Sequence, residues 1–244
     1  MSDWWLDELA HAGPEHLDPR YVEGYDRKAP TDASVDIAVL REFGFGSEST
    51  MVDLGAGTGV VAFAAAAECR HVTAVDVSAA MVGHLRTRAV ELGLGNVDVV
   101  HAGFLTYEHA GPPVDFVCTR NALHQIPDFW KAIALGRIHG LLKPGGILLV
   151  RDLVYDFEPS EADARMAAWF AGAADDPARG WTAAELAEHV RTEHVALSGQ
   201  PRTLTRRLRR SPFRGRRGCQ RSIRGRRSVA PDRGSPPTGP VRRG

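Results

Sequence analysis

The sequence predicts a doubly wound α/β fold with a mostly parallel sheet. Short apolar runs alternate along the chain with segments of helical periodicity, which is the pattern of βαβ units. The apolar runs are nearly continuous, as expected for parallel strands that are buried on both faces. One run leads into the glycine-rich stretch VDLGAGTG, residues 52–59, and ligands of such sheets bind outside the carboxyl ends of the strands.

Five strands are expected before residue 195. Each is a run of mostly apolar residues, rich in valine, isoleucine or leucine and bounded by glycine or polar residues. Their ranges are 50–55, 71–77, 96–102, 114–120 and 147–153.

Helices are expected between these strands. Ser78 is the predicted N-cap of the helix after the second strand, Ser160 opens a later helix, and Thr182 with Glu185 forms a capping box for another. The helix before the fifth strand should stop at KPGG, residues 143–146, because proline and glycine cannot continue it.

Charge divides the chain into unequal parts. The 244 residues are neutral overall, but 15 of the 30 basic residues, all arginine, and one of the 30 acidic residues fall in 201–244. The net charge is therefore near −14 over residues 1–200 and near +14 over residues 201–244. We expect an N-terminal helical cap over 1–30, a ligand-binding domain over 31–195 and an Arg-, Pro- and Gly-rich tail over 196–244.

Three interpretations of the tail remain open. It is a basic arm for nucleic acid or an anionic surface, a disordered linker, or the product of a frameshift in a GC-rich gene. Codons of such a gene read out of frame yield Arg, Pro, Gly and Ser. We favour the frameshift, because residues 201–244 contain no Lys, Trp or Tyr, which basic nucleic-acid-binding arms commonly include.

Composition also excludes some classes of protein. The sequence contains no run of about 18 apolar residues, so we expect no membrane span. The acidic start lacks the basic region of a secretory signal, and a cytoplasmic protein is therefore expected. Cys69, Cys118 and Cys219 lie far apart and match no metal-binding spacing. We expect reduced thiols and no metal site.

The glycine-rich loop favours a particular ligand. Gly55 and Gly57 allow a tight turn and a close ligand approach, and Gly59 allows close packing of the next helix, whose first N–H groups favour an anionic group. Nicotinamide and flavin enzymes hold a pyrophosphate with G-x-G-x-x-G, whereas the spacing here is G-x-G-x-G after an acid, Asp53. A carboxylate repels pyrophosphate and attracts an ammonium group. The better ligand carries both an ammonium and a carboxylate.

These motifs resemble those of the class I S-adenosylmethionine-dependent methyltransferases, in the same order, from Asp53 to Asp152. VDLGAGTG resembles the first motif and TAVDVS the second. HAGFLTYEH occupies the adenine-contacting segment. DFVCTRNALHQIPD resembles the segment at the end of the fourth strand that faces the transferred methyl group, and LLKPGGILLVRD resembles the turn into the fifth. The resemblance implies S-adenosyl-L-methionine as cofactor and a sheet of seven strands that ends in an edge hairpin.

The resemblance also implies the cofactor-binding residues. The loop and its acid would hold the methionine end, an acid at the end of the second strand would accept hydrogen bonds from the ribose hydroxyls, and backbone groups would contact adenine. The family often has an acid at or near Gly103, and this sequence has none there. From the methionine end to the adenine end, these residues are Asp53, Gly55, Gly57, Gly59, Asp76, Val77, Gly103 and Phe104.

Four residues are candidates for the acceptor side. Asn121 and His124 follow the fourth strand; Asn121 is expected to contact cofactor or acceptor. His124 is either a general base, an acceptor-orienting group or a loop histidine bonded to backbone. Tyr21 and Tyr25 lie in the segment that often folds over the cofactor in the family, and the alternative is that they pack on the sheet edge.

The sequence therefore predicts a methyltransferase that acts on a small molecule by direct displacement. The alternatives are a nicotinamide-dependent oxidoreductase and a nucleic-acid-binding module carried by the tail, although no base-recognition motif supports a nucleic-acid partner. Because five strands are expected where the family has seven, we expect the last two to be missing. The fifth strand would then be an exposed edge, and the chain poorly stable or inactive.

Overall fold

The computed structural model describes residues 4–28, 32–177, 179–197 and 204–207. They belong to a compact unit, Met1–Arg210, and the second unit, Ser211–Gly244, lies outside the described residues. The interpretations of the tail beyond residue 207 therefore concern residues that the structure does not describe. No described helix is long and apolar enough to cross a membrane.

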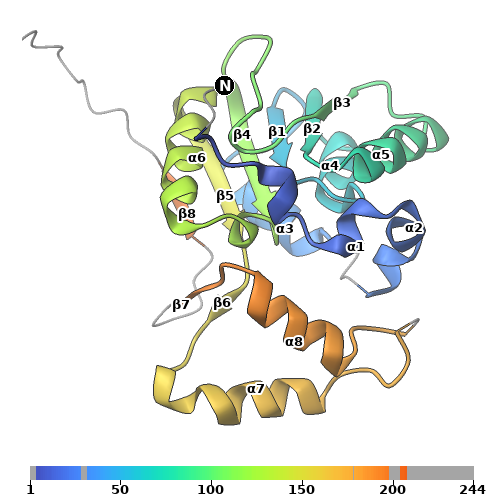
Figure 1. Cartoon of the computed structure of the whole chain (residues 1–244). Coiled ribbons are helices and arrows are strands. Elements are labelled where there is room, and N and C mark those ends of the chain that lie inside the picture. The colour runs from blue at the N-terminus through green and yellow to red at the C-terminus, as the bar shows by residue number, and fades with distance from the viewer. Residues whose placement is uncertain (1–3, 29–31, 178, 198–203, 208–244) are drawn as a thin grey trace, which may run out of the picture. The chain divides into compact units, whose positions relative to one another are not determined.

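A six-stranded sheet forms the centre of the described unit (Figure 1). Its order is β3-β2-β1-β4-β5-β8; the first five strands are parallel and β8 is antiparallel to β5. The fold class is therefore confirmed. The strands are β1 (Thr50–Leu54), β2 (His71–Asp76), β3 (Val97–His101), β4 (Val114–Arg120), β5 (Leu142–Arg151) and β8 (Leu204–Arg207).

Side chains alternate along the strands, so the sheet has a core on each face. Met51 and Cys118 belong to a cluster that packs on α3 (Ser34–Glu42), α4 (Val60–Ala66) and α5 (Ala79–Glu91). Val52 and Val117 belong to a second cluster, which packs on α6 (Asp128–Leu141). The sheet is thus doubly wound, and the strand order reverses between β1 and β4, where ligands of such folds bind.

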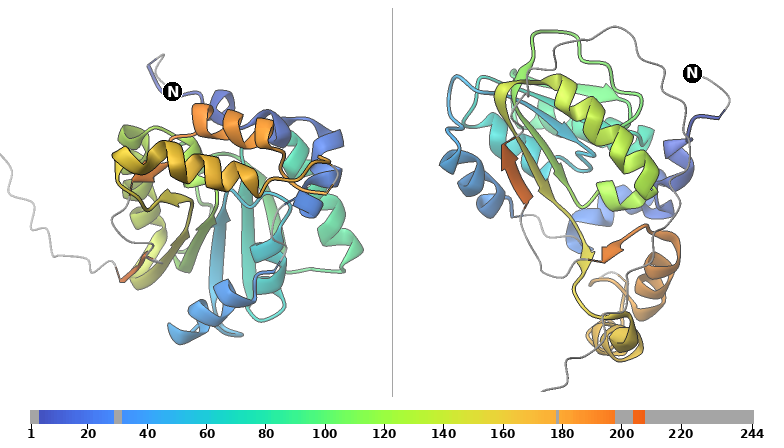
Figure 2. Two further views of the ribbon diagram at one scale, coloured as in Figure 1. Left: turned by 90° about the horizontal axis from the view of Figure 1, so that it is seen from below. Right: turned by 90° about the vertical axis from the view of Figure 1, so that its left-hand side faces the viewer.

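Smaller elements lie at the carboxyl ends of the strands (Figure 2). The N-terminal segment forms η1 (Glu8–His11), α1 (Pro14–Leu17) and α2 (Pro19–Lys28). After β5, the chain forms β6 (Val154–Tyr155), η3 (Pro159–Glu161), α7 (Ala162–Ala171), α8 (Ala183–Thr192) and β7 (Ala196–Leu197), and β7 pairs with β6 in parallel.

The predicted helix caps agree with the structure at two of three places. The Ser78 hydroxyl accepts a hydrogen bond from the Met81 N–H, and Thr182 forms the reciprocal capping box with Glu185. The prediction for Ser160 was wrong, because it lies inside η3, and α7 follows with Glu161 as its N-cap.

KPGG is not a turn between α6 and β5. The helix ends at Leu141 and β5 begins at the next residue, with Leu142 opposite Val114 and Ile147 opposite Phe116. The residues between them bulge from the strand, and Gly145 adopts a φ of 83° there. Proline ends the helix as expected, but backbone pairing resumes before the proline.

The prediction that strands end before residue 196 was also wrong. β8 pairs with β5 over Ile147–Val150, so β5 is not an exposed edge along that stretch. An edge strand is held by main-chain hydrogen bonds and needs no buried face, so a short segment can pair without an apolar pattern. The two cysteines that the structure describes, Cys69 and Cys118, are free thiols as expected, and both are buried.

Candidate active site

The glycine-rich loop turns sharply between β1 and α4. Gly55, Gly57 and Gly59 all have positive φ, at 72°, 56° and 91°. A Cβ on Gly55 would overlap the Ala122 side chain, whereas a Cβ on Gly57 would meet no atom within 4 Å. Gly55 therefore allows close packing on the segment after β4, which the sequence analysis did not predict, whereas Gly57 faces open space.

Asp76 fixes this loop and also faces the cavity beside it. Its Oδ2 accepts a hydrogen bond from the Gly57 N–H at 2.9 Å, and its Oδ1 accepts one from the Ser78 N–H at 2.9 Å. The side chain is 8% exposed, and burial raises the pKa of its carboxyl despite these two donors. A carboxylate has about four acceptor sites, so about two remain for hydroxyl groups of a ligand.

Asp53, at the end of β1, is the most buried acid of the site. It is 2% exposed, and burial, followed by the charges of Asp76 and Asp36, raises the pKa of its carboxyl to about 7. Arg120, at the end of β4, lowers this pKa in part, and its guanidinium lies 3.1 Å from Asp36. A cationic group that entered here would stabilise the ionised form of Asp53 and so lower the pKa of its carboxyl.

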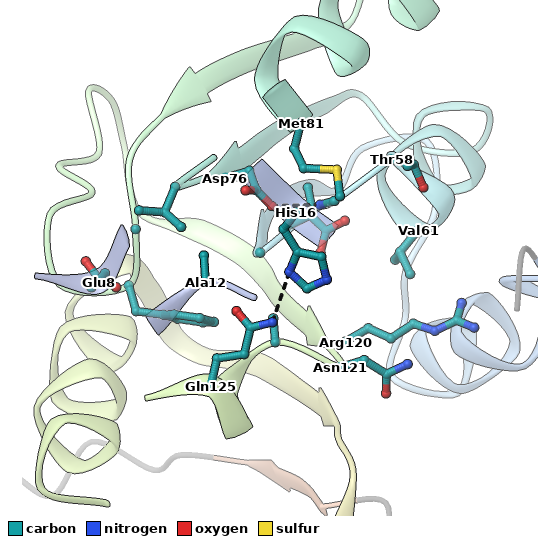
Figure 3. A pocket seen from close by; sticks show the side chains of 18 of the residues that line it. Glu8, Ala12, His16, Thr58, Val61, Asp76, Met81, Arg120, Asn121 and Gln125 are labelled. Carbon is teal, nitrogen blue, oxygen red and sulfur yellow. Dashed lines mark hydrogen bonds between the residues drawn. The ribbon is translucent and has the colours of Figure 1, made fainter. Parts of the chain in front are cut away.

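One cavity brings the predicted cofactor residues together (Figure 3). Asp53, the loop glycines Gly55 and Gly57, and Asp76 line it beside Val77, Gly103 and Phe104. Gly59 lies behind the loop, where a Cβ would overlap the Phe63 ring. The volume of this cavity is about 110 Å³.

The N-terminal segment covers this cavity. His16 projects into it, and its Nδ1 lies 3.1 Å from the Gln125 side-chain amide (Figure 3). The Ser78 hydroxyl donates a hydrogen bond to the His16 carbonyl at 2.5 Å. Both contacts join residues more than 60 positions apart, and no local motif in the sequence indicated them.

Glu8 is a site residue that the sequence analysis missed. It comes from η1, is 6% exposed, and accepts a hydrogen bond from the Leu105 N–H at 3.0 Å. A Cβ on Gly103 would overlap the Glu8 carboxylate. Burial raises the pKa of this carboxyl. The sequence has no acid at Gly103, but the carboxylate of Glu8, 95 residues earlier in the chain, lies beside this position.

A second cavity, of about 660 Å³, adjoins the first. Tyr25 and Asn121 line both cavities, as do His16 and Gln125. Asn121 has a φ of 50°, a left-handed conformation that asparagine tolerates better than most residues. The backbone of Tyr21 lies in α2, but its side chain lies outside the described residues.

His124 lines the second cavity only, and it is 5% exposed. Its Nδ1 lies 2.5 Å from Asp152 Oδ1, and its backbone N–H donates to Asp152 Oδ2 at 2.9 Å. A carboxylate only accepts hydrogen bonds, so Nδ1 carries a proton toward Asp152, and Nε2 on the other side of the ring lies 3.5 Å from Glu193 Oε2. This arrangement differs from the alternative in which the ring is bonded only to backbone.

Comparisons with known proteins identify the domain. The family described as "Methyltransferase domain" matches residues 51–146. An uncharacterised methyltransferase of Mycobacterium bovis is 35% identical over 100 residues, covering 41% of this chain and 48% of that protein. A ubiquinone/menaquinone biosynthesis C-methyltransferase of Brucella anthropi is 31% identical over 140 residues, covering 52% of each chain.

A solved structure extends the likeness. Phosphoethanolamine N-methyltransferase 2 of Haemonchus contortus, in complex with phosphomonomethylethanolamine and S-adenosylhomocysteine, has a TM-score of 0.50 and 25% identity. The match covers 60% of this chain and 36% of that one. The chain spans about half the length of the curated relatives it matches first. The sheet order, the glycine-rich loop and these matches together support a class I S-adenosylmethionine-dependent methyltransferase domain in this chain.

Proposed function

We propose that the chain is an enzyme that transfers the methyl group of S-adenosylmethionine to a small-molecule acceptor. The observation that carries this proposal is the gathering of three buried carboxylates, Glu8, Asp53 and Asp76, around one cavity. Their charges would repel the pyrophosphate of a dinucleotide and attract a ligand with a sulfonium and an ammonium group. The nicotinamide alternative therefore fits this cavity poorly.

The polar groups suggest how the cofactor lies. Asp53 faces its ammonium group, and Arg120, which lines the same cavity, offers a cation to its carboxylate. Asp76 accepts hydrogen bonds from the ribose hydroxyls with the sites that Gly57 and Ser78 leave open. Val77 and Phe104 then flank the base.

Glu8 supports the placement of adenine. Its carboxylate lies against the backbone of the Gly103–Leu105 segment, at the end of the cavity away from Arg120 (Figure 3). The exocyclic amine of adenine is a hydrogen-bond donor, and a buried carboxylate is a strong acceptor for it. We therefore assign adenine recognition to Glu8 as well as to the backbone of Gly103 and Phe104.

We infer that the N-terminal segment moves when the cofactor enters. Ligand cavities usually measure about 300–1,000 Å³, and the cavity here, into which His16 projects, measures about 110 Å³. Movement of α1 that breaks the contact between His16 and Gln125 opens the cavity. Closure over the bound cofactor then excludes water from the reacting atoms.

The second cavity is the proposed acceptor site. It adjoins the cofactor cavity at Tyr25 and Asn121, and His124 lies in its wall. Methyl transfer from a sulfonium is a direct displacement, so aligning acceptor, methyl carbon and sulfur supplies much of the rate increase, about 7–11 kcal/mol in favourable cases. His124 lies in the wall of this cavity, where it helps to orient the polar atom of the acceptor.

Small acceptors agree with the relatives, whose names specify phosphoethanolamine and ubiquinone/menaquinone biosynthesis. A cytoplasmic location and the lack of a nucleic-acid partner remain predictions from the sequence.

Calorimetry tests the proposal. S-adenosylmethionine, S-adenosylhomocysteine and NADH are titrated into the chain and into the Asp76→Ala variant, with unfolding curves recorded for both. We expect the two adenosyl ligands to bind and the variant to lose about 10- to 100-fold in affinity, the scale of hydrogen bonds to a charged group. Tighter binding of NADH, or equal affinity of the variant, would contradict the proposal.

A nucleoside pair tests the role of Glu8. In S-inosylhomocysteine a carbonyl replaces the 6-amino group, so Glu8 would face an acceptor instead of a donor. We expect the wild-type chain to prefer S-adenosylhomocysteine by at least about tenfold, and Glu8→Met to lose most of this preference. An unchanged preference in the variant would place adenine elsewhere.

A further inference from the structure

Three side chains with metal-binding atoms meet behind the acceptor cavity. His124 comes from η2 (Leu123–Gln125), His189 from α8, and Glu193 is the C-cap residue of α8. One ligand atom from each lies within 4.8 Å of the other two. His189 and Glu193 are four residues apart, a spacing that places two side chains on the same side of a helix.

The distances between these atoms suit a shared cation. His124 Nε2 lies 3.5 Å from Glu193 Oε2, and His189 Nδ1 lies 3.7 Å from Glu193 Oε1. Both distances exceed the usual 2.7–3.2 Å or so of a hydrogen bond. Ligands about 2.0–2.2 Å from a zinc ion at tetrahedral angles are separated by about 3.3–3.6 Å. The three ligand atoms here lie within 4.8 Å of one another, so small side-chain movements would bring them to one ion.

Asp152 prepares His124 for metal binding. Its carboxylate accepts the Nδ1–H of His124 and is itself held by the backbone N–H groups of His124 and Leu153. Histidines that bind metals usually donate their other ring N–H to a carboxylate or carbonyl, which directs the lone pair at the metal. The His194 N–H donates to the His124 carbonyl at 2.8 Å, so the end of α8 is joined directly to η2.

The cavity in front of the cluster defines the ligand that could reach such an ion. Both His124 and His189 line it, whereas Glu193, with a 5% exposed side chain, lies behind them. Trp169 and Trp181 also line the cavity. Two imidazoles and one carboxylate leave at least one coordination position for a further ligand. The body of an acceptor in this cavity would contact the two tryptophan rings, and its heteroatom would bind the ion.

We propose that His124, His189 and Glu193 bind a divalent transition-metal cation of the zinc type. The cation holds the methyl acceptor through an oxygen, nitrogen or sulfur atom in the cavity next to the cofactor. This inference rests on the proposed function for the role of the ion, but binding of the ion itself does not. It replaces the prediction that the chain has no metal site, and it selects acceptors with an apolar or aromatic body and a metal-binding heteroatom.

Metal titration of the full-length chain tests this inference. The protein is treated with a chelator, and Zn²⁺ and Co²⁺ are titrated by calorimetry without cofactor; the visible absorption of bound Co²⁺ reports its coordination. We expect one Co²⁺ site of four or five ligands. His189→Ala and the near-isosteric Glu193→Gln should each weaken Zn²⁺ binding by at least about tenfold, as should Asp152→Asn through His124.

His84→Ala is the matched control, because His84 lies on α5 and belongs to neither cavity. Unfolding curves establish that each variant is folded. Equal Zn²⁺ affinity of the wild type, His189→Ala and Glu193→Gln would overturn the inference, and so would a wild-type chain that binds neither ion.

The same preparations separate this inference from the proposed function. S-adenosylmethionine affinity is measured in the chelator-treated protein, where it should equal that of the zinc-loaded protein within about twofold. Cofactor binding without metal binding overturns only the metal site. Metal binding without cofactor binding overturns the proposed function and removes the assigned role of the ion.

Discussion

Replacing Asp53 by asparagine should stabilise the folded chain at neutral and alkaline pH while it weakens cofactor binding. Asp53 is buried at the end of β1, and the nearby charges of Asp76 and Asp36 add to the cost of ionising it. Asparagine has nearly the same shape and carries no charge. The variant therefore removes the cost of a buried charge that, in our account, is kept for the ammonium group of the cofactor.

The magnitude follows from the pKa of Asp53, which is about 7 in the folded protein and about 3.9 in an unfolded chain. Between these values the folded state keeps a proton that the unfolded state has lost, so folding stability falls as the pH rises from about 4 to about 7. A difference of about three pKa units corresponds to at most about 4 kcal/mol at pH 8, and to about 1 to 2 kcal/mol at pH 5.

Urea denaturation at pH 5 and pH 8 measures this effect. The free energy of unfolding of Asp53→Asn should exceed that of the wild type at pH 8, and the difference should shrink at pH 5. Asp163→Asn, on the exposed surface of α7, is the matched control and should show little difference at either pH. If Asp53→Asn is less stable than the wild type at pH 8, or the difference is the same at both pH values, the reasoning is refuted.

Four further predictions follow. Because Asp53 must be ionised to bind an ammonium group, cofactor affinity measured by calorimetry should fall roughly five- to tenfold from pH 7.5 to pH 6, and Asp53→Asn should lose this dependence. Gly55→Ala should lower the urea midpoint more than Gly57→Ala, because only the former overlaps Ala122; the reverse order would contradict the loop packing. Asp36→Asn should destabilise the chain by about 3 kcal/mol in the same assay, because the buried Asp36 carboxylate pairs with the guanidinium groups of both Arg120 and Arg151; a neutral effect would argue against these pairs. If the tail is a frameshift product, another reading frame of the coding DNA beyond codon 195 should encode strand-like sequence, and its absence there would exclude this origin.

Local sequence signals predicted most of the candidate cofactor residues that line the first cavity. The acid and glycines of VDLGAGTG, and Asp76 at the end of the next strand, lie on segments whose geometry is set by neighbours in the chain. Parallel strands then bring their carboxyl ends to one edge, so Asp53 and Asp76 meet without any further information. These predictions needed only strand ends and turn chemistry.

Residues whose roles depend on long-range packing were not predictable in this way. Glu8 reaches Leu105 across 97 positions, and His16 reaches Gln125 across 109. Nothing in the periodicity of either segment indicates the partner. The carboxyl that covers Gly103 could have been suspected only from the missing acid at that position, which shows that some acceptor is needed but not where it comes from.

The acceptor side illustrates the same limit. His124 was a candidate from its place after the fourth strand, but its partners Asp152 and Glu193 come from β5 and the end of α8. A spacing of 65 residues between His124 and His189 matches no metal motif, so the sequence favoured no metal site. β8 was not predicted, because main-chain pairing with β5 requires no particular pattern of apolar side chains.

A crystal structure of the chain with S-adenosylhomocysteine tests the central claim most directly. The account predicts that the ribose hydroxyls lie within about 3 Å of the Asp76 carboxylate, with the ammonium group toward Asp53 and the adenine amine toward Glu8. A nucleoside bound elsewhere, or bound here with Asp53 and Asp76 turned away from it, would contradict the account.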